Sequence, residues 1–176
     1  MEDVLIVVDV QNDFVYGTLG SSEAQAIIPA IKEKIEMYDR KGKEIAFTKD
    51  SHDENYLNTP EGKKLPIKHC ILRTNGHKIV DGLETKNSKY LIKDTFGCSE
   101  CEWKEALKVL GNPKSIEMIG LDTDICVITN ALIIKTLRPE IEITVDASCC
   151  AGSTPEKHKA ALEVMKSCQI NVIGED

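Results

Sequence analysis

Apolar and polar positions form blocks along the chain that predict strands and helices in regular succession. Val4-Leu5-Ile6-Val7-Val8 is an uninterrupted apolar run, typical of a strand buried on both faces of a parallel sheet. Shorter apolar runs predict five further strands, over residues 43–48, 90–92, 115–119, 141–145 and 170–173.

Apolar residues at helical spacing separate these runs. They predict helices over residues 23–41, 101–110, 124–137 and 155–168. Gly42 suits the end of the first helix, and Pro139 stops the third. Residues 50–89 form a long irregular stretch rich in turn residues, and a loop of this length is usually functional or carries short elements of its own.

This alternation predicts an α/β fold with three layers: a single, Rossmann-like, six-stranded parallel sheet with helices on both faces. A chain of 176 residues is long enough for one full hydrophobic core, and no internal repeat or linker divides it, so we expect one domain over residues 1–176. In such folds the ligand site lies beyond the carboxyl ends of the strands.

Composition narrows the range of partners. The hydrophobic content of 41% and charged content of 29% are typical of a soluble globular protein, and no apolar run is long enough to span a bilayer. The chain opens directly into a strand, without a basic-then-apolar leader, so we expect a cytoplasmic protein without membrane contact. A net charge of −7 without any Lys/Arg run argues against binding to nucleic acid.

The seven cysteines are numerous for such a chain. Cys98 and Cys101 have CxxC spacing, which suits a redox pair, half of a zinc site or two incidental thiols. Cys149 and Cys150 are adjacent and are interpreted as free thiols, because vicinal disulfides are strained. A thiol-redox or zinc-scaffold protein using these four cysteines is therefore one alternative class of function.

The segment Gly120–Cys126 holds the clearest chemical signal. An apolar strand runs into a glycine and then into Thr and Asp residues that suit a helix N-cap, which places Cys126 in the first helical turn. Unpaired backbone N–H groups and the helix dipole favour a thiolate there. Cys126 is therefore a candidate nucleophile.

Two other strand ends carry ionisable groups. Asp9 follows the first strand and Lys93 ends the third, so both are expected at the same edge of the sheet as Cys126. A carboxylate can take the thiol proton, an ammonium favours the thiolate, and helix-terminal N–H groups can hold an oxyanion. This set is sufficient for cysteine-based acyl transfer.

The loop after the second strand offers metal ligands at the same edge. Asp50 and His52 follow that strand, and His69 lies further along the loop. One carboxylate and two imidazoles suit Zn²⁺ or a similar divalent ion, with water completing the coordination shell.

Three segments, VDVQNDF, KDTFG and GLDTDICV, resemble those of the isochorismatase-like cysteine hydrolases, and among these the nicotinamidases most closely. The resemblance spans nearly the whole chain and implies a catalytic triad of Asp9, Lys93 and Cys126. It also implies a cis peptide between Leu121 and Asp122, with an oxyanion hole formed by the backbone N–H groups of Asp122 and Cys126. Finally, it implies that Asp50, His52 and His69 bind a metal that holds the pyridine nitrogen of the substrate.

The chain departs from the nicotinamidase pattern around the expected substrate. Leu65 stands where nicotinamidases usually carry Trp, with one extra residue before the His-Cys pair, and Ile125 stands where the residue before the nucleophile is usually aromatic. Arg73-Thr74 replaces the usual Gly-Thr. Phe14, Phe96 and Ile125 are the expected walls of the substrate pocket.

These patterns predict an amidohydrolase that forms a thioester on Cys126. Its favoured substrate is nicotinamide, because the metal trio is present. A hydrolase of a carbamoyl, ureido or other small aliphatic amide with the same triad is the alternative, which the lost aromatics favour. The helix face from Ile125 to Leu137 is apolar enough to bury against a second copy, so we also expect a homodimer or larger homo-oligomer.

Overall fold

The computed structural model describes residues 2–175 and contains a six-stranded sheet. The strands are β1 (Val4–Val8), β2 (Glu44–Asp50), β3 (Lys89–Lys93), β4 (Ser115–Leu121), β5 (Glu142–Ala151) and β6 (Asn171–Ile173). Their order is β3-β2-β1-β4-β5-β6, and every neighbouring pair is parallel. The predicted three-layer α/β architecture is confirmed.

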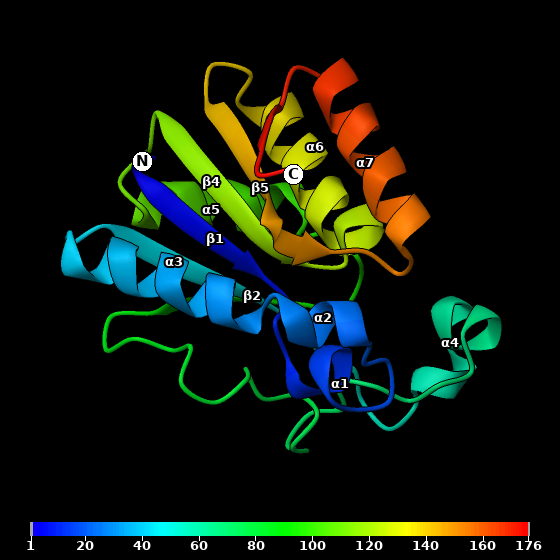
Figure 1. Cartoon of the computed structure of the whole chain (residues 1–176). Coiled ribbons are helices and arrows are strands. Elements are labelled where there is room, and N and C mark those ends of the chain that lie inside the picture. The colour runs from blue at the N-terminus through cyan, green and yellow to red at the C-terminus, as the bar shows by residue number, and fades with distance from the viewer. Residues whose placement is uncertain (1, 176) are drawn as a thin grey trace.

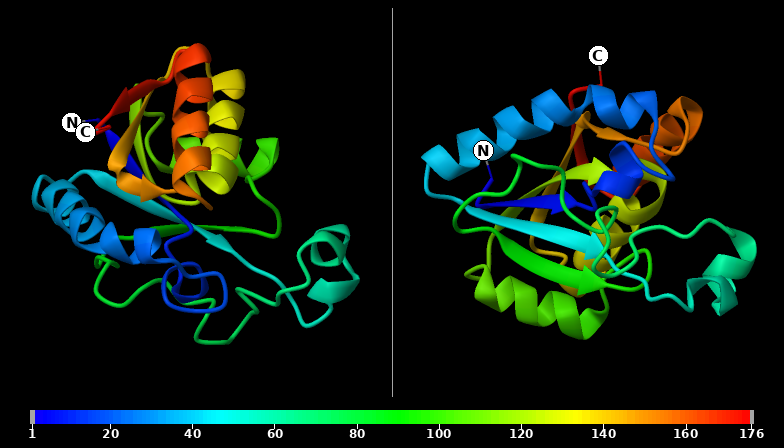
Figure 2. Two further views of the ribbon diagram at one scale, coloured as in Figure 1. Left: turned by 45° about the vertical axis from the view of Figure 1, so that its right-hand side comes forward. Right: turned by 90° about the horizontal axis from the view of Figure 1, so that it is seen from below.

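Helices cover both faces of the sheet (Figures 1 and 2). On one face lie α5 (Glu100–Val109), α6 (Ile128–Leu137) and α7 (Pro155–Ser167), and on the other lie α2 (Ser22–Ala26) and α3 (Ile28–Arg40). Short helical segments sit within the connections: α1 (Asn12–Val15), the 3₁₀ turn η1 (Tyr56–Asn58), α4 (Pro60–Lys64) and the π-helical turn η2 (Thr123–Val127).

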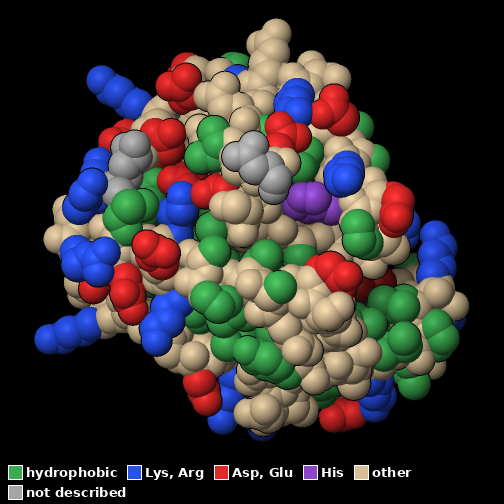
Figure 3. All heavy atoms as spheres, in the orientation of Figure 1, with side chains coloured by type: hydrophobic (Ala, Val, Ile, Leu, Met, Phe, Trp, Pro, Cys, Tyr) green, Lys and Arg blue, Asp and Glu red, His purple; other side chains and the backbone are tan. Residues whose placement is uncertain are grey.

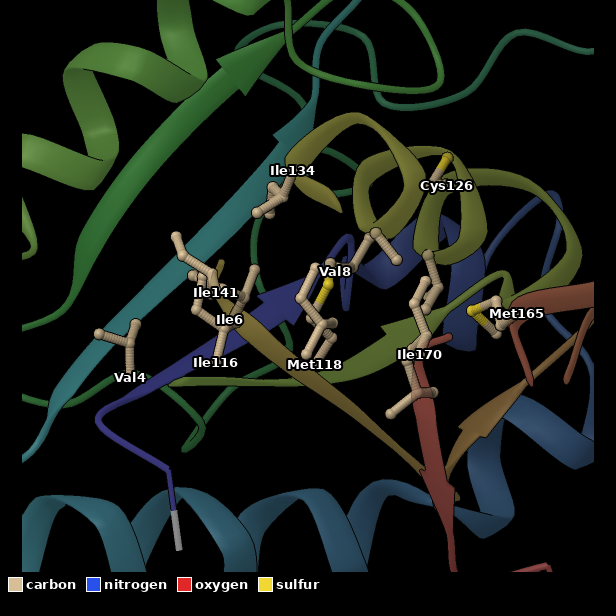
Figure 4. Packing of buried hydrophobic residues seen from close by; sticks show 14 of the residues in the cluster. Val4, Ile6, Val8, Ile116, Met118, Cys126, Ile134, Ile141, Met165 and Ile170 are labelled. Atoms are coloured by element: carbon tan, nitrogen blue, oxygen red, sulfur yellow. The ribbon is translucent and has the colours of Figure 1, made fainter. Parts of the chain in front are cut away.

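The alternation of side chains along β1 divides the apolar core into two clusters. Val4, Ile6 and Val8 face α5, α6 and α7, where they pack with residues such as Met118 (Figure 4). The intervening Leu5 and Val7 belong to the cluster under α3. Because all five β1 residues are at most 1% exposed, β1 is the buried centre that its apolar run predicted.

The prediction of one continuous helix over 23–41 was wrong, because the structure has two helices there. α2 ends at Ala26 and α3 begins at Ile28, with Pro29 in the first turn of α3. A proline inside a continuous helix lacks the N–H for the hydrogen bond to the fourth preceding residue, and its ring clashes with that carbonyl. The apolar spacing continues across the break, so the pattern alone did not reveal it.

β5 is longer than predicted and runs on to Ala151. Cys149 and Cys150 therefore lie within a strand instead of following one, and both are buried as free thiols. β4 passes close to β1 near its end, where Gly120 has a φ of 119° and an added Cβ would lie 2.1 Å from the carbonyl oxygen of Val8. Only glycine allows this approach.

A buried polar cluster lies between α3 and the sheet. Lys34 Nζ lies 2.6 Å from Glu117 Oε1 and 2.7 Å from Asp146 Oδ2. The Tyr38 hydroxyl donates to Glu117 Oε2 at 2.6 Å. One ammonium thus compensates two buried carboxylates, which otherwise would be costly to desolvate.

Acidic and basic side chains are interspersed over the face of the molecule in Figure 3. Among residues 2–175, the structure contains no helix with the length and apolar character needed to cross a bilayer.

Candidate active site

The sheet register brings the carboxyl ends of four strands together. Val8, the last residue of β1, pairs with Thr48 of β2 and with Gly120 of β4. At the end of β2, Asp50 pairs with Lys93 of β3. Because these strands are parallel, the side chains that follow them emerge at one edge of the sheet, as predicted.

Asp9 is held in place by its neighbour on β2. Its backbone has a φ of 49°, in the left-handed region, and its N–H donates to the Thr48 carbonyl at 3.2 Å. The Thr48 hydroxyl donates to Asp9 Oδ1 at 2.6 Å. Asp9 is completely buried, so its carboxylate has a fixed position and little contact with solvent.

Lys93 connects the groups of the site. Its ammonium nitrogen lies 2.6 Å from Asp9 Oδ2, 3.7 Å from Cys126 Sγ and 3.5 Å from Asp50 Oδ1. Burial alone would lower the pKa of Lys93, but the charges of Asp9, Cys126 and Asp50 raise it overall. Lys93 therefore remains a cation next to the sulfur.

The surroundings of Cys126 favour its protonated thiol form. Burial, followed by the negative charge of Asp9, raises the pKa of Cys126 well above its usual value, although Lys93 opposes this. This shift runs against the preference for a thiolate that was expected from the helix terminus, which stays a prediction. Burial also raises the pKa of Asp9, which makes this carboxylate a better proton acceptor.

The turn that carries Cys126 has an unusual hydrogen-bond pattern. The peptide between Leu121 and Asp122 is cis, as the resemblance implied, and the π-helical turn η2 follows. The Asp122 carbonyl accepts from the N–H groups of Ile125 at 3.0 Å and Val127 at 3.1 Å, but among the described residues not from that of Cys126 between them. The Cys126 N–H thus stays free of this carbonyl.

This turn is attached to the start of α7. The Thr123 hydroxyl lies 2.7 Å from His158 Nδ1, and both oxygens of Asp124 accept from Ser153, one from its N–H and one from its hydroxyl, at 2.7 Å each. His158 of α7 therefore contacts the turn that carries the candidate nucleophile. Its apolar neighbours in the last helix did not indicate this contact.

Asp50, His52 and His69 converge as predicted for metal ligands. All three are buried, and one potential ligand atom from each lies within 4.8 Å of the others. Asp50 Oδ2 lies 2.9 Å from His52 Nε2 and 3.4 Å from His69 Nε2. Because His69 Nδ1 donates to the Ile67 carbonyl at 2.8 Å, its neutral ring has a lone pair on Nε2, the form that binds a metal. The donor set fits Zn²⁺ or a similar divalent ion.

Glu61 and Tyr56 also border the trio, and sequence reasoning missed both. Glu61 Oε1, from α4, lies 3.8 Å from Nε2 of both His52 and His69. The ring of Tyr56 packs against both imidazoles, with centroids 4.7 Å from His52 and 5.0 Å from His69. The irregular composition of residues 50–89 concealed these short helices, so no periodicity indicated which side chains they present.

Two polar residues after β1 hold the loop with the candidate metal ligands against the sheet. Gln11 is buried, and its amide both donates to the Asp50 carbonyl at 2.8 Å and accepts from the Asp50 N–H at 2.7 Å. Asp13 accepts from the Cys70 N–H at 2.8 Å. The polar residues of the segment VDVQNDF therefore position the ligands Asp50 and His69.

A cavity of about 320 Å³ opens over these groups, a size suited to a small molecule. Phe14, Phe96 and Ile125, the predicted walls, line it together with Cys126. Asp50, Glu61, Leu65 and His69 also line it, as do Ser21, Asp122, Ser153 and Lys157. The candidate nucleophile and two of the candidate metal ligands, Asp50 and His69, thus face one pocket.

The cysteines outside this pocket form no comparable site. Within residues 2–175, the only group of His, Cys, Asp and Glu side chains with converging donor atoms is Asp50, His52 and His69. Cys98 is buried and Cys101 is exposed, and both are free thiols. This arrangement does not support the zinc-scaffold alternative.

Comparison with known proteins gives consistent results. Residues 3–176 match the family described as the Isochorismatase domain. The chain is 28% identical to the nicotinamidase of Schizosaccharomyces pombe, with 97% of this chain and 92% of that protein covered. It is 25% identical to the nicotinamidase/pyrazinamidase of Mycobacterium tuberculosis, covering 96% of this chain and 97% of that one.

Solved structures show the same similarity. The pyrazinamidase of Pyrococcus horikoshii in complex with zinc superposes with a TM-score of 0.86 at 30% identity, covering 98% of this chain and 99% of that one. The nicotinamidase of Bacillus subtilis superposes with a TM-score of 0.85 at 26% identity, covering 98% and 99%.

Proposed function

The chain belongs to the isochorismatase family, and on this premise we propose that it hydrolyses nicotinamide to nicotinate and ammonia through a thioester on Cys126. It is a hydrolase of amide C–N bonds. The observation that supports the specific reaction is that Cys126, which contacts the buried Lys93–Asp9 pair, lines the same pocket as Asp50 and His69 of the candidate metal trio.

In the first step, Asp9 takes the thiol proton of Cys126, and the sulfur attacks the carboxamide carbon. The raised pKa of Asp9 suits it to accept that proton, and Lys93 stabilises the thiolate as it forms. The N–H groups of Asp122 and Cys126 then hold the negative oxygen of the tetrahedral intermediate. Loss of one such donor typically raises the barrier by about 3 kcal/mol.

In the second step, the C–N bond breaks and Asp9 returns its proton to the departing ammonia. A water molecule then loses a proton to Asp9 and attacks the thioester carbon, and the acid is released as the Cys126 thiol re-forms. The burial of Asp9 supports this exchange, because it limits loss of the proton to bulk water.

Asp50, His52 and His69 would hold the divalent ion, and Glu61 is close enough to approach it. When bound, such an ion supplies a Lewis-acid position for the lone pair of a pyridine nitrogen. The Pyrococcus horikoshii relative, a pyrazinamidase, was solved in complex with zinc, which supports zinc as the first ion to test. The protein's own part is to orient the ring through Phe14 and Phe96, which line the pocket.

A small carbamoyl, ureido or other aliphatic amide is the second candidate substrate class. Leu65 and Ile125, rather than the aromatic residues usual in nicotinamidases, line the pocket. A flat ring therefore has fewer aromatic partners here, whereas an aliphatic amide loses nothing by their absence.

The test is a panel of amides assayed for ammonia release with zinc-loaded and metal-free enzyme. We expect nicotinamide and pyrazinamide to be hydrolysed and the Cys126→Ala variant to be inactive but folded. Preferential hydrolysis of carbamoyl amides by metal-free protein would show that the substrate belongs to the second class and is not nicotinamide. Retained turnover by Cys126→Ala would reject the thioester route altogether.

We also propose a homodimer or larger homo-oligomer. Ile128, Leu132 and Ile133 of α6 are only partly buried in the single chain, which supports a further covering of this face. Sedimentation equilibrium checks this; a monomer at all concentrations would contradict it.

A further inference from the structure

Asn130, in the first turn of α6, makes four hydrogen bonds although it is fully buried. Its Oδ1 accepts from the N–H of Cys98 and from the indole N–H of Trp103, each at 3.0 Å. Its Nδ2 donates to the carbonyl of Cys126 at 2.8 Å and to that of Phe96 at 3.3 Å. Every donor of this amide and both of its acceptor positions are used.

The orientation of this amide is determined by its partners. Two N–H groups require an acceptor, and two carbonyls require donors, so the flipped amide would face four unfavourable contacts in a buried site. The side chain is therefore fixed at both ends, and its position depends on elements that are far apart in the sequence.

The two ends of Asn130 face different parts of the molecule. The acceptor end contacts Trp103 of α5 and Cys98, which precedes that helix. Both residues belong to the core. The donor end contacts the backbone of Cys126 itself and that of Phe96, whose side chain lines the pocket. One amide thus joins the peptide that follows the candidate nucleophile to the loop that forms a pocket wall.

We infer that Asn130 is a positioning residue that fixes the backbone of Cys126 relative to the pocket loop and so aligns its sulfur and N–H for attack. This inference rests on the proposed cysteine mechanism. The Cys126 carbonyl lies where the π-helical turn passes into α6, so the regular hydrogen-bond pattern of a helix changes at this point. The Asn130 donor adds a hydrogen bond to that carbonyl from a side chain that is also held by Trp103 of the core.

Three variants separate positioning from simple stability. Asn130→Ala removes all four bonds. Asn130→Thr loses the bond to Trp103 but retains a hydroxyl that can donate to the carbonyl four residues earlier, which is that of Cys126. Trp103→Phe removes a bond only at the acceptor end. Each is measured for kcat, KM, urea stability and the rate at which iodoacetamide alkylates Cys126, followed on its peptide by mass spectrometry.

We expect Asn130→Ala to lower kcat about tenfold to a hundredfold, with a much smaller change in KM, because misplaced catalytic groups cost that much. Asn130→Thr should recover most of kcat and of the alkylation rate without recovering stability. Trp103→Phe should lose stability but keep kcat. Equal losses of kcat in the Ala and Thr variants, or a loss in Trp103→Phe as large as in Asn130→Ala, would overturn the inference. If the wild-type protein hydrolyses no amide, the proposed function fails, while the ranking of alkylation rates still decides the role of Asn130.

Discussion

Lys93 Nζ lies 2.6 Å from Asp9 Oδ2, and both side chains are only 1% exposed. Because this ion pair is screened so little by water, each member acts strongly on the nearby Cys126, in opposite directions. Asp9 raises the pKa of the thiol and Lys93 lowers it. The same carboxylate that opposes the thiolate at rest is the group placed to receive its proton.

Asp9→Asn should therefore separate thiol reactivity from turnover. Removal of the negative charge lowers the pKa of Cys126, so its alkylation by iodoacetamide should reach half its maximal rate at a lower pH than in wild type. Amide hydrolysis should fall by about a hundredfold to ten-thousandfold, because the proton carrier is gone. Ammonia assays and alkylation profiles of the Cys126 peptide give the two readouts.

Lys93→Met is the matched control for this pair. Loss of the cation raises the pKa of Cys126, so alkylation should shift to higher pH, opposite to Asp9→Asn. A shift in the same direction for both variants would contradict the electrostatic interpretation of the site.

Metal binding should depend on His69 and not on His77. Loss of an outer hydrogen-bond partner of a metal ligand already weakens metal binding by about tenfold to a hundredfold. His69→Ala removes one of the three converging donors itself, so it should weaken zinc binding by at least that factor. His77 also lies in the loop, with Nε2 2.6 Å from the Ser51 hydroxyl, but is not in the trio. Competition with a chromogenic chelator measures both, and equal weakening by His77→Ala would argue against the proposed ligand set.

Asp122 should make the folded protein less stable as the pH rises. Burial, followed by the charge of Asp124, raises the pKa of Asp122 to about 7. In the unfolded chain it is about 3.9, so between these values the folded state binds more protons and the free energy of unfolding falls with increasing pH. Asp122→Asn removes this loss and should be on the order of 2 kcal/mol more stable than wild type at about pH 8.

Urea unfolding at about pH 8 and again below pH 4 checks this, because the advantage should vanish where Asp122 is protonated in both states. Asp94→Asn, a change at an exposed carboxylate, is the control. An advantage of Asp122→Asn that stays constant with pH would show that the titration of Asp122 is not its cause.

Lys34→Met should destabilise the fold strongly. Glu117 and Asp146 have side chains only 5% and 7% exposed and share Lys34 as their cation, so the variant leaves two buried charges without compensation. Removal of one partner from a buried pair typically costs about 3–5 kcal/mol. Lys34→Met should therefore shift the urea midpoint far below that of Lys32→Met, which alters an exposed lysine on the same helix.

The effect of Lys34→Met should also shrink in acid. Burial tends to raise the pKa of Asp146, but its bonds with Lys34 and Ser148 lower it overall. A depressed carboxyl pKa stabilises the folded state above the unfolded value, and this contribution is lost as the pH falls through the folded value. A deficit that grows on acidification would contradict the assignment.

Local patterns identified most of the fold because they depend on burial. The apolar run of β1 required two covered faces, and the helical spacing of later segments supplied those covers. The break before Pro29 was missed because the apolar spacing continues across it, and the extension of β5 through Cys149 and Cys150 was missed because neighbouring strands decided it. The short helices that carry Tyr56 and Glu61 gave no periodic signal.

By itself, the sequence determined which chemical groups stand at the strand ends: Asp9, Lys93 and Cys126, with Asp50, His52 and His69 nearby. That inference was possible because parallel strands present their carboxyl ends at one edge. Only the tertiary structure decided how deeply Cys126 is buried and which charges surround it, and that burial raises the pKa of its thiol. It alone also assigned partners to Asn130 and His158, because hydrogen bonds between distant elements depend on side chains that packing, and not spacing along the chain, brings together.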